Sequence, residues 1–188
     1  MSGRKSETRK RILAAAGRVL AERGPGDPAV AEVMAEAGLT VGGFYAHFAS
    51  KDALMLEAFR QLLRVRRDRL AQVDQSLTGR ERRVLLAAFY LSRRHRDDAD
   101  DADDADDADE RCPLPSSLAE IARLPDGFRQ TLAEHIELIT AQMSGTPEEG
   151  DVALADLALM IGGLTLARAL GPGELSDRVL RAAKSAVV

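Results

Sequence analysis

The first fifty residues hold three short apolar segments at helical spacing, and glycines separate them. The first segment runs from about Ser6 to Arg23 and is followed by Gly24. The second follows Asp27 and Pro28, and Gly38 ends it. The third begins at Thr40 and carries residues 41–47. Asp27 and Thr40 are residues that cap helix starts, and glycine tolerates the left-handed backbone at helix ends. This punctuation predicts a compact unit of three helices.

Helical spacing continues through the rest of the chain. Ser50 is positioned to cap a long helix over 51–74, and further segments are predicted at 84–91, 116–122, 126–143, 151–169 and 175–186. The sequence has no run of alternating β-branched residues of the kind that a strand needs. We therefore predict an all-α fold, with one domain at 1–50 and a second helical domain at 51–188.

Charge is distributed unevenly along the chain. The formal net charge is −4, but residues 97–110 alone carry ten of the thirty acidic residues. The other residues hold 26 basic and 20 acidic side chains, and the basic excess is concentrated before residue 24. The repeat contains no apolar residue larger than alanine, so we predict an acidic low-complexity loop at 97–110. A calcium site is the alternative, but the repeat lacks the glycine turn that calcium loops use.

The single cysteine and the apolar segments indicate the compartment. Cys112 cannot form a disulfide within the chain, and no secretion signal is recognisable at the N-terminus. The strongly apolar stretch from Leu157 to Ala167 is too short for a bilayer, which needs roughly 20 residues. We expect a cytoplasmic protein that does not enter the membrane. Cys112 is interpreted as a structural thiol, with redox or electrophile sensing beside Arg111 as the alternative.

Residues 30–48 have the form of a helix-turn-helix, in which the second helix enters the major groove of DNA. Val33, Ala37, Leu39, Phe44 and Phe48 are predicted to pack the two helices together. The other face then presents Val41, Gly42, Tyr45 and Ala46. Two adjacent glycines, Gly42 and Gly43, would let the helix approach a phosphate closely. The candidate DNA contacts are Thr40, Val41, Gly42, Gly43, Tyr45, His47 and Lys51, with Arg4, Lys5 and Arg9 reaching from an N-terminal arm.

The segments TRKRILAAAGRVLAERG and VAEVMAEAGLTVGGFYAHFASKDAL resemble the N-terminal domain of the TetR family of transcriptional regulators. The resemblance implies a helical homodimer that binds a palindromic operator, usually as a repressor, and loses DNA affinity when a small-molecule effector binds its C-terminal domain. It also carries DNA contact over to Thr40, Gly42, Tyr45, His47 and Lys51. Pro28, Val41 and Ala46 depart from the family pattern, which affects the operator sequence. The GGFYAHF wording and the Cys112 to Leu114 segment are similar to a subgroup related to the LmrA and YxaF regulators.

The C-terminal domain offers candidates for effector binding and for dimerisation. Effector pockets are mostly apolar with a few polar groups, and the candidates to line one are Phe89, Tyr90, Cys112, Phe128, His135 and Met160. Ordinary core packing is the alternative for each of them. The helix over 151–169 is apolar on nearly every face, so we expect it to form half of a four-helix dimer interface with the last helix. Burial within one subunit is the alternative.

The competing function is an enzyme or a helical small-molecule-binding protein that does not bind DNA. The three histidines and the cysteine lie far apart in sequence, and neither an HExxH motif nor a phosphate loop is present. We therefore predict no enzymatic activity, no metal site and no cofactor. Steep salt dependence of DNA binding would separate the two functions.

Overall fold

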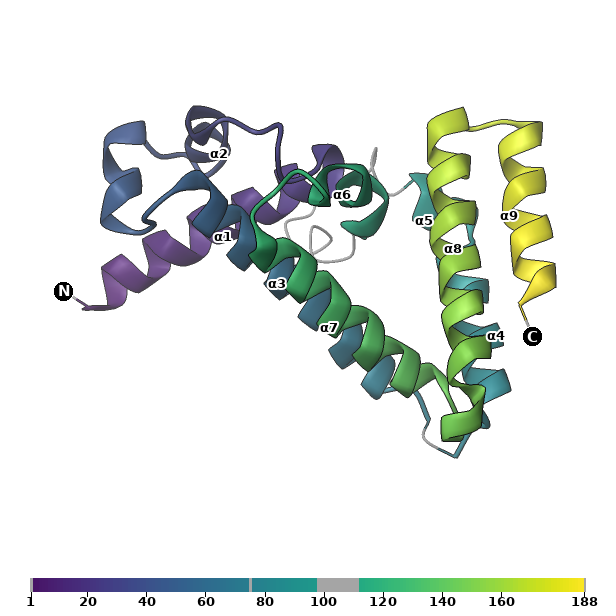
Figure 1. Ribbon diagram of the computed structural model, residues 1–188. Helices are drawn as coiled ribbons and strands as arrows, with labels where there is room; N and C mark the ends of the chain where they lie inside the picture. Colours follow the sequence, from purple (N-terminus) through teal and green to yellow (C-terminus); the bar gives the residue numbers. More distant parts are fainter. Residues whose placement is uncertain (1, 75, 98–111, 188) are drawn as a thin grey trace. The chain divides into compact units, whose positions relative to one another are not determined.

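The computed structural model describes residues 2–74, 76–97 and 112–187 (Figure 1). In order, the elements are α1 (Ser2–Arg23), α2 (Val30–Glu36), η1 (Val41–Ala46), α3 (Lys51–Ala71), α4 (Gly79–Tyr90), α5 (Arg93–Asp97), α6 (Leu114–Ile121), α7 (Asp126–Met143), η3 (Pro147–Glu149), α8 (Gly150–Leu170) and α9 (Glu174–Ala186). No strand occurs within these ranges, and the all-α prediction is confirmed. Most of the predicted acidic loop, residues 98–110, lies outside the described residues, as does Arg111.

The chain forms two compact units, and α3 and α7 each contribute to both. Among the described residues, the first unit comprises 2–65 and 112–131, and the second comprises 66–74, 76–97 and 132–187. These units are defined by packing. The functional division at residue 50 stays a prediction.

The first unit is built on α1, which packs against α2 and α6. Its core is apolar and almost fully excluded from solvent: Ile12, Ala16 and Leu20 of α1, Val33 and Met34 of α2, Phe44 of η1, and Leu54, Met55, Ala58 and Phe59 of α3. Phe59 also meets Phe128 of α7, with ring centroids 5.9 Å apart. These contacts hold the short elements α2 and η1, which are too short to be stable alone.

The second unit is organised around α8, which packs against α4, α5 and α9. Figure 1 shows α8 and α9 running side by side as the last two helices. Two arginines make buried polar contacts within this unit. Arg83 of α4 approaches Asp156 of α8 at 3.0 Å, and Arg96 of α5 bonds Ser176 and Asp177 of α9 at 2.9 and 2.8 Å.

The starts of α1 and α2 differ from the sequence prediction, and α4 begins at Gly79, ahead of the segment predicted at 84–91. α1 begins at Ser2, where the apolar spacing predicts a start near Ser6, because nothing in residues 2–6 stops a helix and Thr8 bonds back to the Arg4 carbonyl at 2.9 Å. The N-terminal arm is therefore helical. At α2 the N-cap is Ala29 and not Asp27. Glu32 accepts the Ala29 N–H at 3.0 Å, while Asp27 lies 3.4 Å from Arg23.

The helical stretch from Pro147 to Leu170 is longer than the apolar segment Leu157–Ala167 suggests. Its 24 residues are apolar enough, by length and composition, to cross a membrane, because alanine, leucine and glycine continue the helix on both sides. Core helices of soluble proteins pass the same test. α8 packs against its neighbours and carries the buried Asp156, as a core helix does.

Candidate nucleic-acid interface

The turn between α2 and η1 is tight because Gly38 takes a left-handed backbone. Its φ is +65°, which favours glycine over other residues. The Gly38 and Leu39 N–H groups return to the Ala35 and Met34 carbonyls at 2.8 Å each. This is the helix end that the sequence predicts. The turn sends the chain back so that Phe44 is fully buried beside α2.

The element after the turn is a 3₁₀ helix and not the regular helix expected at 41–47. It spans six residues, Val41–Ala46. A 3₁₀ helix suits short runs, and the adjacent Gly42 and Gly43 lower the propensity for a longer α-helix. Thr40 occupies the predicted N-cap position, but its side chain makes no capping hydrogen bond within the described residues.

One face of η1 is open to solvent. Val41 is 47% exposed and Tyr45 is 74% exposed, and Gly42, Gly43 and Ala46 are also exposed. A Cβ atom added at Gly42 or Gly43 would meet nothing within 4 Å. The Tyr45 ring stands edge-on to the buried Phe44 ring at 5.1 Å. The Phe44 ring therefore supports the Tyr45 ring, while the Tyr45 hydroxyl remains available to a partner.

His47 and Lys51 border this face and are half-buried. The His47 Nδ1 atom is buried and has no hydrogen-bond partner among the described residues, so contact with a phosphate would use Nε2. The Lys51 ammonium donates to the Gly26 carbonyl at 2.8 Å. An ammonium carries three donors, and this bond uses one of them.

Arg9 is paired with a residue of the first unit and does not extend as an arm. Its guanidinium makes two bonds of 2.6 Å to the Glu57 carboxylate and lies 4.6 Å from the centroid of the Phe48 ring. The hydrogen bonds to Glu57 raise the pKa of Arg9. Arg9 therefore joins α1 to α3 and to the end of the helix-turn-helix.

Other basic residues of α1 also bond within the unit. Arg11 donates to the Ala37 carbonyl at 2.8 Å, Arg18 pairs with Glu36 at 2.9 Å and Arg23 pairs with Glu32 at 2.9 Å. Sequence composition could not reveal this pairing. The exposed cations that remain on α1 are Arg4, Lys5 and Lys10.

The six effector candidates are divided between the two units. Cys112 and Phe128 belong to the first unit, whereas Phe89, Tyr90, His135 and Met160 belong to the second. Five of them are buried, and Phe89 is 51% exposed. The thiol of Cys112 is fully buried, which favours the structural interpretation over a sensor.

Two buried histidines shape the interior of the second unit. The His135 Nδ1 atom lies 3.0 Å from Arg67, and burial lowers the pKa of His135 to about 4. His95, which was not among the candidates, is 1% exposed and lies beside the Phe89 and Tyr90 rings at 5.3 and 5.0 Å. Burial lowers the pKa of His95 to about 3, with Arg66 and Arg168 adding to the effect.

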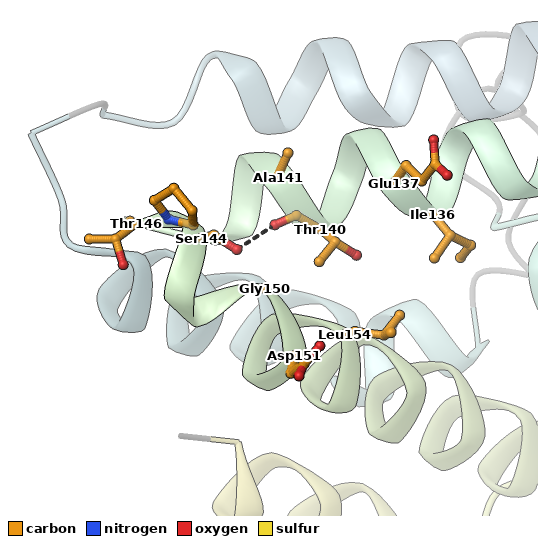
Figure 2. A pocket seen from close by; sticks show the side chains of 11 residues that line it. Ile136, Glu137, Thr140, Ala141, Ser144, Thr146, Gly150, Asp151 and Leu154 are labelled. Carbon is orange, nitrogen blue, oxygen red and sulfur yellow. Dashed lines mark hydrogen bonds between the residues drawn. The ribbon is translucent and has the colours of Figure 1, made fainter.

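A pocket of about 640 Å³ lies between the end of α7 and the start of α8. Figure 2 shows Ile136, Thr140 and Leu154 around this space, with Asp151 near its edge. None of the sequence candidates lines it, and it has no local sequence signal because a helix connection creates it. Over the described ranges, no group of three or more His, Cys, Asp or Glu side chains is placed to hold a metal ion.

Comparison with known proteins agrees with this architecture. Residues 12–58 match the family model described as bacterial regulatory proteins, tetR family. A Bacillus subtilis protein, the uncharacterized HTH-type transcriptional regulator YerO, is 29% identical over 97 residues, which are 49% of this chain. The chain spans about a third of the length of that relative, 34%.

Solved structures share the fold over nearly the whole chain. The reduced form of Escherichia coli NemR covers 97% of each chain with a TM-score of 0.73 and 20% identity. A TetR-family regulator from Cytophaga hutchinsonii covers 97% of this chain and 94% of its own, with a TM-score of 0.68 and 20% identity. A regulator from Saccharomonospora viridis, solved in complex with choline, covers 96% and 95%, with a TM-score of 0.66 and 21% identity. These likenesses confirm an N-terminal helix-turn-helix followed by a helical C-terminal domain.

Proposed function

We propose that the chain is a transcriptional regulator of the TetR family, whose model matches residues 12–58, and that it is a repressor released from a palindromic operator by a small-molecule effector. The family consists of transcriptional regulators with a DNA-binding domain and not of enzymes. The operator contact, the effector response and the dimer are the parts of the proposal that need experiments.

The observation that carries the proposal is the open face of η1. It presents an exposed aromatic ring, Tyr45, and two positions without side chains, Gly42 and Gly43, on an element whose Phe44 is fully buried. In the major groove, Gly42 and Gly43 would permit close backbone approach, and Tyr45 and Lys51 would donate to phosphates. Thr40 and Val41 would contact base edges, where a thymine methyl suits an apolar partner. His47 and Arg4 would add phosphate contacts at the two sides.

The direct test is fluorescence anisotropy with the intergenic DNA beside the protein's own gene. We expect affinity to fall steeply as salt rises, because each phosphate that a cation neutralises releases counterions. Unrelated DNA of the same length is the control. Equal, weak binding to both duplexes at low salt would contradict operator recognition.

Two variants connect the binding to η1. Tyr45→Phe removes one hydroxyl from an exposed ring, so we expect weaker operator binding with unchanged thermal stability. Leu85→Ala on α4 is a matched control, since Leu85 is 51% exposed and lies in the second unit. Loss of binding in the control would mean that the assay reports general damage.

We propose a homodimer through α8 and α9. The exposed apolar side chains of these helices support it: Val152, Leu154, Leu166, Leu170 and Leu175 are 38 to 59% exposed. Gly162 of α8 is also exposed, and an added Cβ there would meet nothing within 4 Å. A two-fold dimer would place two η1 elements about one DNA turn apart, roughly 34 Å.

The dimer is tested by analytical ultracentrifugation of Leu166→Arg. Leu166 is 59% exposed, so the change should leave the subunit folded while it places a charge in the proposed interface. We expect a monomer, with Leu85→Arg remaining dimeric. A wild-type monomer at micromolar concentration would exclude this part of the proposal.

Effector binding belongs to the second unit in this proposal. Its support is the choline complex of the S. viridis protein and the presence of the candidates Tyr90, His135 and Met160 among the buried residues of this unit. Phe89 remains a candidate at the surface of the second unit, whereas Cys112 and Phe128 belong to the first unit.

A compound that lowers operator affinity must itself bind more weakly to the DNA complex by the same factor. Titrations of each partner in the presence of the other check this reciprocity. The cytoplasm is the compartment that this function requires.

A further inference from the structure

Gly26, in the loop between α1 and α2, is fixed from two sides within the first unit. Its N–H donates to Glu120 Oε2 of α6 at 2.8 Å. Its carbonyl accepts from the Lys51 Nζ of α3 at 2.8 Å. Both bonds are partly buried, so water competes with them less than it would at an open surface. A carboxylate on α6 and the ammonium of Lys51 are thereby joined through one backbone residue.

At Gly24 and Gly26 the loop lies so close to α6 that an added side chain would crowd it. Gly24 has a φ of +86°, and a Cβ atom there would lie 2.7 Å from the Ser116 carbonyl oxygen, a backbone atom. Ser116 also donates to the Leu20 carbonyl at the end of α1, at 3.1 Å. Because backbone meets backbone here, a displacement of α6 must displace the loop.

Lys51 gains a fixed position from this arrangement. A free lysine side chain loses rotamer entropy when it is held on a phosphate. The bond to Gly26 restrains the Lys51 side chain before DNA binds, and it leaves two of the three ammonium donors for another partner. The loop in turn depends on Glu120, because the carboxylate holds its N–H in place.

We propose that Glu120 is a positioning residue for DNA binding, which acts through Gly26 to hold Lys51 where it meets phosphate. The inference rests on the proposed function. It gives α6 a specific role in DNA binding. When the Glu120 carboxylate moves away from Gly26, the loop and the Lys51 side chain are released together. It also assigns a role in DNA binding to an acidic residue, although negative charge by itself opposes that binding.

The direction of the change in operator affinity distinguishes positioning from general electrostatics. Glu120→Ala removes one negative charge, and so does Glu22→Ala, a matched control at an exposed position of α1. General electrostatics predicts equal or tighter operator binding for both variants. Positioning predicts that Glu120→Ala binds roughly three- to tenfold more weakly. Glu120→Gln should stay within about twofold of wild type, because its amide oxygen accepts the same N–H.

Combination with Lys51→Met identifies the route. Lys51→Met alone should weaken binding and lower the salt slope by about 1, as expected for one lost phosphate contact. In that background, Glu120→Ala should have no further effect on affinity, although any effect on melting temperature should persist. Equal effects of Glu120→Ala in both backgrounds would overturn the proposal. If wild type binds no operator, the proposed function fails and not the link between these residues.

Discussion

Mild acid should destabilise the protein because its second unit buries two uncharged histidines. Burial lowers the pKa of His95 to about 3 and that of His135 to about 4, from an ordinary value of 6.5 in each case. Arg66 lies near both rings and makes protonation less favourable still. The folded protein therefore does not take up these protons at pH 5, whereas the unfolded chain does.

The size of the effect follows from the two pKa values. Above pH 6.5 these histidines cost no stability, because they are uncharged in the folded and the unfolded states. Below pH 6.5 the unfolded chain takes up protons and the folded protein does not, so the free energy of unfolding falls until the pH reaches the folded pKa. Each pH unit below 6.5 costs about 1.4 kcal/mol per histidine. At pH 5 the loss is about 2 kcal/mol for each residue and about 4 kcal/mol together. That is a large part of the 5–15 kcal/mol typical of folded domains.

Urea unfolding followed by circular dichroism at about pH 7.5 and 5.0 measures the loss. Protein concentration must be fixed because a dimer adds its own dependence. Hydrogen bonds lower the pKa of carboxylates such as Glu32 and Glu149, so these groups stay charged over this range. His95→Gln and His135→Gln should each remove about half of the difference. A pH difference that both variants retain would refute the reasoning.

Three further predictions concern stability. Asp156→Ala removes one of two carboxylates that pair with the buried Arg83, at 3.0 Å, while Glu149 remains at 2.6 Å. We expect a loss of about 1–3 kcal/mol in urea unfolding, whereas Glu36→Ala breaks an exposed pair and should cost less than about 1 kcal/mol. Phe44→Ala empties a fully buried site and should cost about 3–5 kcal/mol with loss of operator binding. Gly163→Ala places a Cβ 2.8 Å from a side chain of α9, so the melting temperature should fall, by an overpacking cost of about 1–3 kcal/mol.

The helical architecture was predictable because it depends on local patterns. Glycine at 24 and 38 marks two helix ends, and both residues have positive φ. The helix over 126–143 has the predicted bounds, since apolar spacing and the proline and glycines around it leave little ambiguity. Ser50 accepts the Ala53 N–H at 3.1 Å, as its capping position predicts. Periodicity and capping act over a few residues, which is the range that a sequence displays directly.

The destination of long polar side chains was not predictable in the same way. Arg9 meets Glu57, 48 residues away, and Gly26 meets Glu120, 94 residues away. No local pattern distinguishes these acids from exposed ones, because the pairing arises when helices pack. For this reason the sequence predicts a DNA-binding arm that includes Arg9, and it gives no signal for Glu120. The resemblance to the LmrA and YxaF regulators stays a prediction.

The internal pairing of α1 has a consequence for how the protein searches a chromosome. Arg9, Arg18 and Arg23 are paired with Glu57, Glu36 and Glu32. The first unit therefore presents less positive potential than the run of basic residues before residue 24 suggests. Attraction to the phosphate backbone at random sites is mainly electrostatic. Dwell times on irrelevant sequence should therefore be short, and the search should proceed more by repeated dissociation and return than by long slides along one duplex.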